Sequence, residues 1–133
     1  MDKTVWSTIQ DNKPIIHSIS NFVTANDNAN ILLALGASPI MADEPQEMAD
    51  ITTISHATVL NIGTPSDRLF EACRLAGLKA NELEHPLIID PVGVGASAYR
   101  RLKMLDLLTE VQPTIIRANV GEVETLVGLE GKA

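Results

Sequence analysis

Short apolar runs alternate with longer amphipathic stretches along most of the chain. The runs are rich in Ile, Val and Leu and end at Gly, Pro, Asn or Asp, which is typical of buried β-strands. They predict strands over residues 15–19, 39–41, 58–62, 87–90 and 114–117.

The stretches between these runs repeat their apolar positions at helical spacing. Gly36 is placed to end one such stretch, and Pro45 lies where the first turn of another begins. Helices are predicted over residues 5–10, 24–35, 43–55, 66–84, 99–110 and 119–127.

Strands that alternate with helices indicate βαβ units, whose right-handed crossovers place helices on both faces of a parallel sheet. We therefore predict a three-layer α/β fold with a mostly parallel sheet. The 133 residues suffice for one such unit, so residues 1–133 are expected to form a single α/β domain.

Charge and composition exclude some partners. The formal net charge of -7 argues against a nucleic-acid partner, because such modules normally carry a basic surface. No apolar run approaches the roughly 20 residues of a membrane-spanning helix, and no leader-like segment follows the N-terminus. We expect a cytoplasmic protein without a membrane partner.

The stretch at residues 87–97 combines a buried strand with a loop suited to a ligand. Asp90 ends the strand, Pro91 stiffens the chain, and Gly93 and Gly95 allow a tight turn and a close approach to a ligand. In open α/β sheets, ligands bind outside the carboxyl ends of the strands. An ordinary turn with an acidic cap is the alternative interpretation.

Polar side chains follow the other strands as well, and parallel strands would bring them to one edge of the sheet. The set comprises Asn21, Met41, Asn61, Gly63, Thr64, Asp90, Arg117, Asn119 and Glu122, of which Met41 is the apolar member. Amides, one guanidinium and two carboxylates suit a phosphorylated or nucleotide ligand with Mg²⁺.

Three of these residues have a purely structural alternative. Arg117 could bind a phosphate or form a salt bridge with Asp90 or Glu122. Asn119 and Glu122 could act together at a ligand or cap the last helix. Met41 could line a pocket or fill a gap in the core.

Two reactive side chains are expected to be structural. His17 lies in the middle of a strand and is predicted to be an interior or interface histidine. Cys73, the single cysteine, lies in an amphipathic pattern, and no basic neighbour has an obvious geometry for lowering its pKa, so a buried thiol is predicted.

Five segments together resemble the hydroxyethylthiazole kinase family of the ribokinase-like group. They are His17-Ser-Ile-Ser-Asn21, Leu32-Leu-Ala-Leu-Gly-Ala-Ser-Pro-Ile-Met-Ala42, Leu60-Asn-Ile-Gly-Thr64, Asp90-Pro-Val-Gly-Val-Gly-Ala96 and Pro113-Thr-Ile-Ile-Arg-Ala-Asn-Val-Gly-Glu122. The resemblance implies ATP-dependent phosphorylation, with Mg²⁺, of the hydroxyethyl group of 4-methyl-5-(2-hydroxyethyl)thiazole in thiamine salvage. It also implies homotrimers with thiazole pockets between the subunits.

The resemblance also implies roles for individual residues. Asn21 and Met41 would contact the thiazole, with Gly63 and Thr64 nearby. Arg117 and Asn119 would bind ATP, and Asp90 and Glu122 would hold the magnesium ion and its waters.

The chain also departs from the family pattern. Family members are about twice as long, and their catalytic residue lies in a glycine-rich segment of the second half. We therefore expect this chain to be the amino-terminal part of a longer ribokinase-like domain, with no catalytic residue of its own and no activity alone. The alternatives are a catalytically inert ligand-binding or subunit-interaction module and a ribokinase-like enzyme for a different alcohol.

Overall fold

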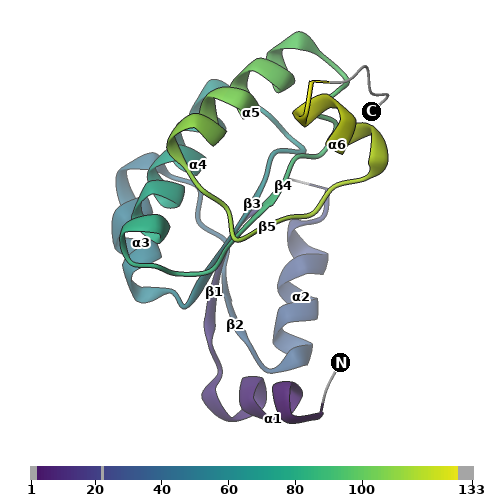
Figure 1. Ribbon diagram of the computed structural model, residues 1–133. Helices are drawn as coiled ribbons and strands as arrows, with labels where there is room; N and C mark the ends of the chain where they lie inside the picture. The colour runs from purple at the N-terminus through teal and green to yellow at the C-terminus, as the bar shows by residue number, and fades with distance from the viewer. Residues whose placement is uncertain (1–2, 22, 129–133) are drawn as a thin grey trace.

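The structure is a computed structural model that describes residues 3–21 and 23–128 (Figure 1). The elements follow one another as α1 Lys3–Asn12, β1 Ile15–Ile19, α2 Ala25–Leu35, β2 Ser38–Ile40, the 3₁₀ helix η1 Pro45–Glu47, α3 Met48–Ile54, β3 Ala57–Asn61, α4 Asp67–Glu82, β4 Leu87–Asp90, α5 Ala98–Glu110, β5 Ile115–Ile116 and α6 Val120–Leu126.

The described strands form one parallel sheet in the order β2-β1-β3-β4-β5. Ser18 pairs with Val59, and Asn61 pairs with Asp90, so the carboxyl ends of the central strands coincide at one edge. The predicted α/β fold with a parallel sheet is therefore confirmed. That edge is where the polar residues at the strand ends were expected to meet.

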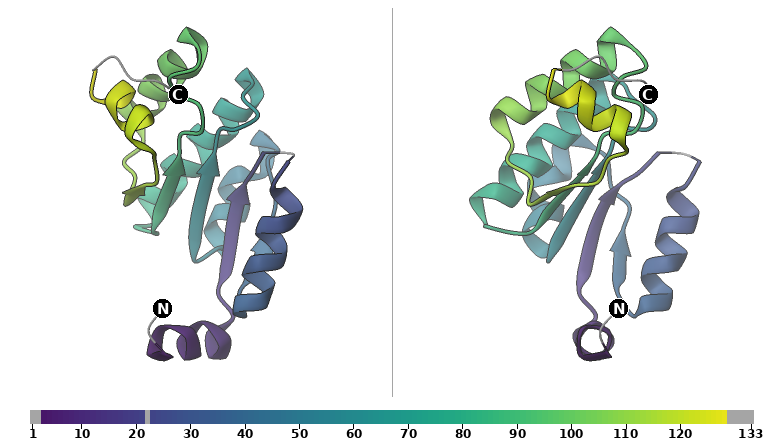
Figure 2. Two further views of the ribbon diagram at one scale, coloured as in Figure 1. Left: turned by 90° about the vertical axis from the view of Figure 1, so that its right-hand side faces the viewer. Right: turned by 45° about the vertical axis from the view of Figure 1, so that its right-hand side comes forward.

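The two faces of the sheet are covered unequally. Helices α3, α4 and α5 lie on one face, and α2 lies on the other (Figures 1 and 2). The side chains of Leu60 and Ile89 point to the first face and are fully buried, whereas Val59 and Ile88 on the second face are only half-buried. The core therefore lies between the sheet and α3 to α5.

Local signals explain where the helices begin and end. The Ser66 and Ser97 hydroxyls accept the backbone N–H groups of Leu69 and Arg100 at 3.0 and 3.1 Å, which caps α4 and α5. Gly36 ends α2 with a left-handed φ of +96°.

Two predicted elements differ from the observed ones. The helix predicted over residues 43–55 is divided into η1 and α3, because Glu47, the last residue of η1, departs from α-helical backbone geometry and is the N-cap of α3. The strand predicted over 114–117 is assigned only at Ile115–Ile116, although the N–H groups of Thr114 and Arg117 still bond to β4 carbonyls.

None of the described helices combines the length and apolar character that crossing a bilayer requires.

Candidate active site at the carboxyl edge of the sheet

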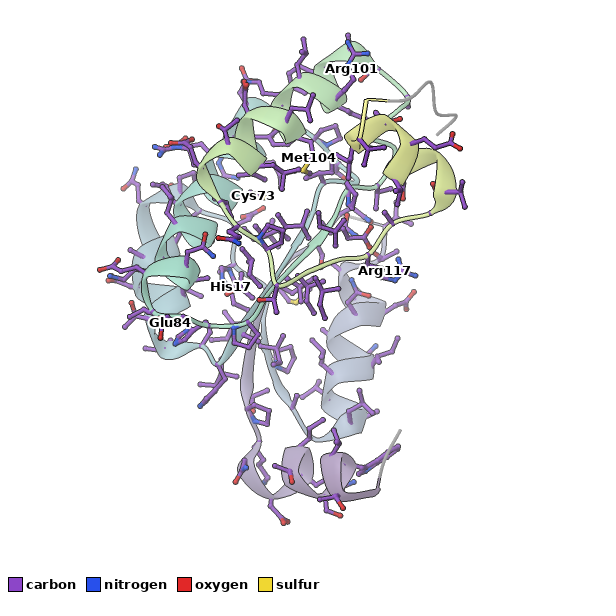
Figure 3. The ribbon with its side chains drawn as sticks, in the orientation of Figure 1. His17, Cys73, Glu84, Arg101, Met104 and Arg117 are labelled. Carbon is purple, nitrogen blue, oxygen red and sulfur yellow. The ribbon has the colours of Figure 1, made fainter. Side chains whose placement is uncertain are left out.

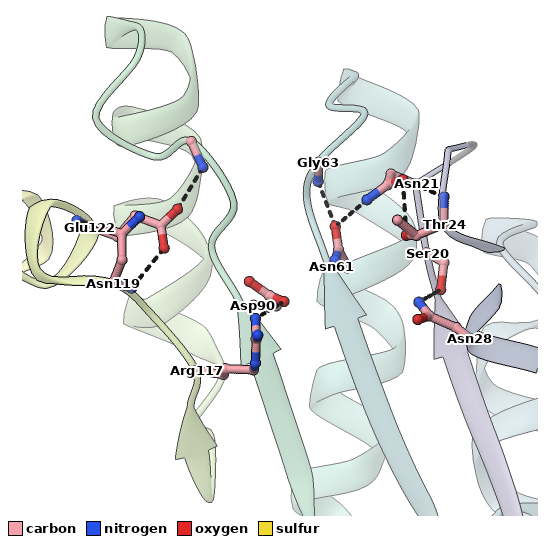
Figure 4. Close-up of polar contacts among 11 residues, drawn as sticks. Ser20, Asn21, Thr24, Asn28, Asn61, Gly63, Asp90, Arg117, Asn119 and Glu122 are labelled. Atoms are coloured by element: carbon pink, nitrogen blue, oxygen red, sulfur yellow. Dashed lines mark hydrogen bonds and ion pairs between the residues drawn. The ribbon is translucent and has the colours of Figure 1, made fainter. Parts of the chain in front are cut away.

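Three side chains at the carboxyl ends of β1 and β3 form an amide network (Figure 4). Asn21 Oδ1 accepts the Thr24 backbone N–H at 2.9 Å and the Thr24 hydroxyl at 3.0 Å. Asn21 Nδ2 donates to Asn61 Oδ1 at 3.3 Å, and the same oxygen accepts the Gly63 N–H at 2.8 Å. The network links the loop after β1 to the loop after β3.

Gly63 is confined by this network. A Cβ atom at Gly63 would lie 2.7 Å from Asn21 Nδ2 and 2.9 Å from Asn61 Oδ1. Both distances are shorter than a normal contact, so the close approach of the two loops depends on the missing side chain.

An open groove of about 600 Å³ lies between α2 and the less covered face of the sheet. Its wall combines amides, hydroxyls and apolar side chains from α2, β1 and β3 with charged residues from the next two strand ends. The lining residues are Ser18, Asn21, Thr24, Asn28, Ile31, Leu32, Val59, Asn61, Asp90, Val92 and Arg117. Such a mixture suits a small ligand that has an apolar ring and a few polar atoms.

A second hollow of about 480 Å³ adjoins the first and is more polar. Asp90, Val92 and Arg117 line both hollows, and Ala118, Asn119 and Glu122 complete the second. Asp90 and Arg117 therefore lie at the boundary between an apolar compartment and an acidic one.

Glu122 is held in place by two backbone groups. Its Oε1 accepts the Asn119 N–H at 3.0 Å, while Asn119 Oδ1 accepts the Glu122 N–H at 2.8 Å, which is a complete capping box at the start of α6. Its Oε2 accepts the Gly93 N–H at 2.9 Å. The capping that the sequence left open as an alternative is thus present, and the same carboxylate also connects α6 to the glycine loop after β4.

Asp90 and Arg117 form an ion pair, with Arg117 Nη1 3.2 Å from Asp90 Oδ2. The salt bridge that the sequence left open as an alternative for Arg117 is thus present. Burial raises the pKa of the Asp90 carboxyl, the nearby Arg117 charge opposes this shift, and repulsion from Glu122 adds to it.

The two carboxylates could take part in binding a divalent cation. The described residues contain no group of three or more His, Cys, Asp or Glu side chains placed to enclose a metal ion. Mg²⁺ does not need such a group, because it is commonly held by one or two carboxylates together with substrate phosphates and water. Asp90 and Glu122 line the same hollow and repel each other, so they fit this mode of binding.

The structure does not bring all the predicted residues together. Asn21, Asp90 and Arg117 line the groove, and Asn119 and Glu122 line the acidic hollow. Gly63 adjoins the groove through the amide network. Met41 follows the edge strand β2 and is 38% exposed. Neither Met41 nor Thr64 is among the residues that line either hollow.

Arg100 is a residue of this edge that the sequence analysis did not identify. Its guanidinium donates to the carbonyl oxygens of Val92 at 2.9 Å, Ile62 at 3.3 Å and Gly63 at 3.4 Å. A cation in the first turn of a helix opposes the helix dipole, but Arg101 in the same turn has the same feature, so the sequence does not distinguish Arg100 from its neighbour.

His17 and Cys73 lie in the interior, as predicted (Figure 3). His17 Nε2 donates to the Ala42 carbonyl at 2.8 Å, and burial lowers the pKa of its imidazole. Burial raises the pKa of the Cys73 thiol to about 12, which makes it unreactive near neutral pH.

Comparison with protein families adds an independent observation. The model of the hydroxyethylthiazole kinase family matches residues 6–133. A hydroxyethylthiazole kinase of Clostridium beijerinckii is 51% identical over 126 residues, which are 95% of this chain and 46% of the relative. One from Clostridium acetobutylicum is 52% identical over 126 residues, with the same coverage. The chain spans about half the length of the curated relatives it matches.

Solved structures agree with this match. A hydroxyethylthiazole kinase protein from Pyrococcus horikoshii OT3 superimposes with a TM-score of 0.89 at 37% identity, covering 94% of this chain and 49% of that one. A receiver domain of a sensor histidine kinase from Pseudomonas aeruginosa superimposes with a TM-score of 0.56 at 15% identity, a likeness of fold alone.

Proposed function

This chain belongs to the hydroxyethylthiazole kinase family, and we propose that its full-length gene product transfers a phosphoryl group from ATP to the alcohol of a hydroxyethylthiazole. The observation that carries the proposal is the pair of adjoining hollows that share Asp90 and Arg117. A reaction between an uncharged alcohol and a polyphosphate needs an apolar compartment beside an ionic one.

The alcohol is assigned to the groove. Ile31, Leu32 and Val59 offer apolar surface for the ring, while Asn21 and Asn61 offer amide groups that fix its orientation. Met41 and Thr64, which the family resemblance places near the thiazole, do not line this groove, so their part in binding remains a prediction.

The phosphates are assigned to the acidic hollow. Arg117 can present its planar guanidinium to phosphate oxygens, and Asn119 lines the same space. Asp90 and Glu122 would hold Mg²⁺ through its waters. Bound Mg²⁺ would neutralise the charge on the phosphates during transfer.

The residues of this edge act by positioning. Phosphoryl transfer requires little covalent chemistry from the protein and depends on alignment and charge neutralisation. We assign no catalytic base among the described residues.

A substrate comparison on the full-length gene product tests the proposal. We expect ATP consumption with the thiazole alcohol and none with pyridoxal or hydroxymethylpyrimidine. Turnover with either of the latter compounds but not with the thiazole would indicate another ribokinase-like enzyme. The absence of turnover with every alcohol would favour an inert binding module.

We also propose a homotrimer for the full-length gene product, as the family resemblance implies. Its native mass checks this, since a trimer has three times the mass measured under denaturing conditions. A monomeric mass would contradict the proposal without affecting the substrate assignment.

A further inference from the structure

Arg100 contacts the loops that follow β3 and β4 at the same time. Its Nη1 donates to the Val92 carbonyl at 2.9 Å and to the Ile62 carbonyl at 3.3 Å, and its Nη2 lies 3.4 Å from the Gly63 carbonyl. All three acceptors are backbone oxygens at the carboxyl edge of the sheet. A single guanidinium thus bridges two loops that are 30 residues apart in the sequence.

The peptide unit between Val92 and Gly93 is bound at both ends by charged side chains. Its carbonyl accepts from Arg100 at 2.9 Å, and its N–H donates to Glu122 Oε2 at 2.9 Å. Because the peptide unit is planar, these two charge-assisted bonds fix its orientation. Gly93 also has a φ of +67°, a backbone conformation that is strained for residues with a side chain. The loop conformation therefore depends on a glycine at this position.

The peptide unit between Ile62 and Gly63 is also bound at both ends, by one charged and one neutral side chain. Its carbonyl accepts from Arg100 at 3.3 Å, and its N–H donates to Asn61 Oδ1 at 2.8 Å. Through Asn61, this unit joins the amide network of the groove. Arg100 therefore connects the amide network on one side with the carboxylate of Glu122 on the other.

The position of Arg100 on its helix is electrostatically unfavourable, and the bonds to the carbonyls offset this cost. It is the third residue of α5, where the partial positive charge of the helix N-terminus disfavours a cation. Nη1 bonds to carbonyls of both loops and Nη2 adds the Gly63 carbonyl, so the planar fork serves three acceptors from two nitrogens, whereas a lysine ammonium offers a single nitrogen.

We propose that Arg100 is a positioning residue. It fixes the loop after β3, which adjoins the alcohol groove, in its position relative to the loop after β4, which adjoins the proposed metal site. The inference rests on the proposed function, because it concerns how the hydroxyl group and the phosphate are aligned. Misalignment of reacting groups by about 1 Å can lower a rate about 100-fold. Loss of Arg100 should therefore affect kcat more than the binding of either substrate.

The kinetic test compares Arg100→Ala, Arg100→Lys and the control Arg101→Ala in the full-length gene product. Arg101 is the exposed neighbour on the same helix and projects away from the sheet edge (Figure 3). We expect kcat to fall about 10- to 100-fold in Arg100→Ala, with KM for ATP and for the alcohol changing less than about threefold. Added guanidinium ions should restore part of kcat in Arg100→Ala but not in Arg100→Lys. An unchanged kcat, or a loss confined to KM, would overturn the proposal.

Amide hydrogen exchange tests the same inference independently of activity. In Arg100→Ala, protection should fall together in segments 61–64 and 91–96, while Arg101→Ala should leave both unchanged. Loss of protection in only one segment would overturn the bridging role. If the unaltered protein has no turnover with the thiazole, the proposed function fails, and the exchange result still decides whether Arg100 couples the loops.

Discussion

Arg117 Nη1 lies 3.2 Å from Asp90 Oδ2 at the boundary between the groove and the acidic hollow. The two partners are unequally exposed, with 79% of the Arg117 side chain accessible but only 16% of the Asp90 side chain. A guanidinium has five N–H donors, so this bond leaves others free for a phosphate. The salt bridge and phosphate binding, which the sequence presented as alternatives, are therefore compatible.

Arg117→Ala in the full-length gene product should weaken ATP binding about 10- to 100-fold and leave the fold intact. An exposed ion pair contributes only about 0 to 1 kcal/mol to stability, whereas a bidentate contact to phosphate is much stronger. Calorimetric titration with ATP and a thermal melt measure the two effects, with Arg101→Ala as the control. Unchanged ATP affinity would restrict Arg117 to the salt bridge.

Asp90 should titrate above the ordinary aspartate value of 3.8, because burial outweighs the attraction of Arg117. When folding raises the pKa of an acid, the group stabilises the folded state most at a pH below its pKa in the unfolded chain. This contribution is lost as the pH rises through its pKa in the folded state. Asp90→Asn should therefore gain stability relative to the unaltered protein as the pH rises through this window. Urea unfolding at a series of pH values measures the difference, and a difference that falls with pH would contradict the prediction.

Glu122→Gln removes the charge of this side chain and one of its two acceptor oxygens. The remaining oxygen can still accept one backbone N–H, but the N–H of either Asn119 or Gly93 would face the amide NH2, so we expect a stability loss of about 1 to 3 kcal/mol. The concentration of Mg²⁺ required for half-maximal turnover should rise, since one of the two carboxylates is lost. Glu122→Ala is the comparison and should lose more stability, because the Gly93 and Asn119 N–H groups lose their acceptor. An unaltered Mg²⁺ requirement in Glu122→Gln would exclude this carboxylate from the metal site.

Gly63→Ala should raise KM for the alcohol, because the added Cβ would lie 2.7 Å from Asn21 Nδ2 and displace the amide network. Replacing Asn21 by Ala removes the atom nearest to the added Cβ, while Asn61 Oδ1 at 2.9 Å remains. The loss of apparent binding free energy for the alcohol, calculated from KM, should therefore be smaller in the double variant than the sum of the losses in the two single variants. A double-mutant cycle measures this difference. Strict additivity would show that Gly63 and Asn21 act separately.

Local patterns explain why most of the fold could be predicted. The apolar runs, the capping serines and the glycine after α2 determine structure within a few residues of their own position. Each can therefore be identified from residue types in the sequence. The meeting of polar side chains at one edge then followed from parallel pairing alone. The strand order was not predicted, and it places Met41 after the edge strand β2, while the groove is lined from α2, β1 and the strands beyond β1.

The contacts that organise the two loops could not be predicted in this way. Arg100 binds backbone carbonyls, which every residue possesses, so its partners carry no signal of residue type. Capping by Glu122 could be raised as an alternative because the Asn119 signal is local, whereas the bond of Glu122 to Gly93 spans 29 residues. Contacts between side chains and distant backbone groups become visible only when the loops have been placed.

The outer strand β5 provides the last prediction, which concerns the 133-residue chain by itself. In the described part of the chain β5 is an edge strand, and Ile115 on the less covered face is 55% exposed. Exposed apolar edge strands pair readily with other copies, and an edge lysine opposes such pairing. We therefore expect this chain to self-associate and Ile115→Lys to shift it toward monomer in sedimentation velocity. Val5→Lys, which also replaces a half-exposed β-branched apolar residue but lies in α1, is the matched control. Equal effects of the two substitutions would mean that general surface polarity, and not the edge of the sheet, controls association.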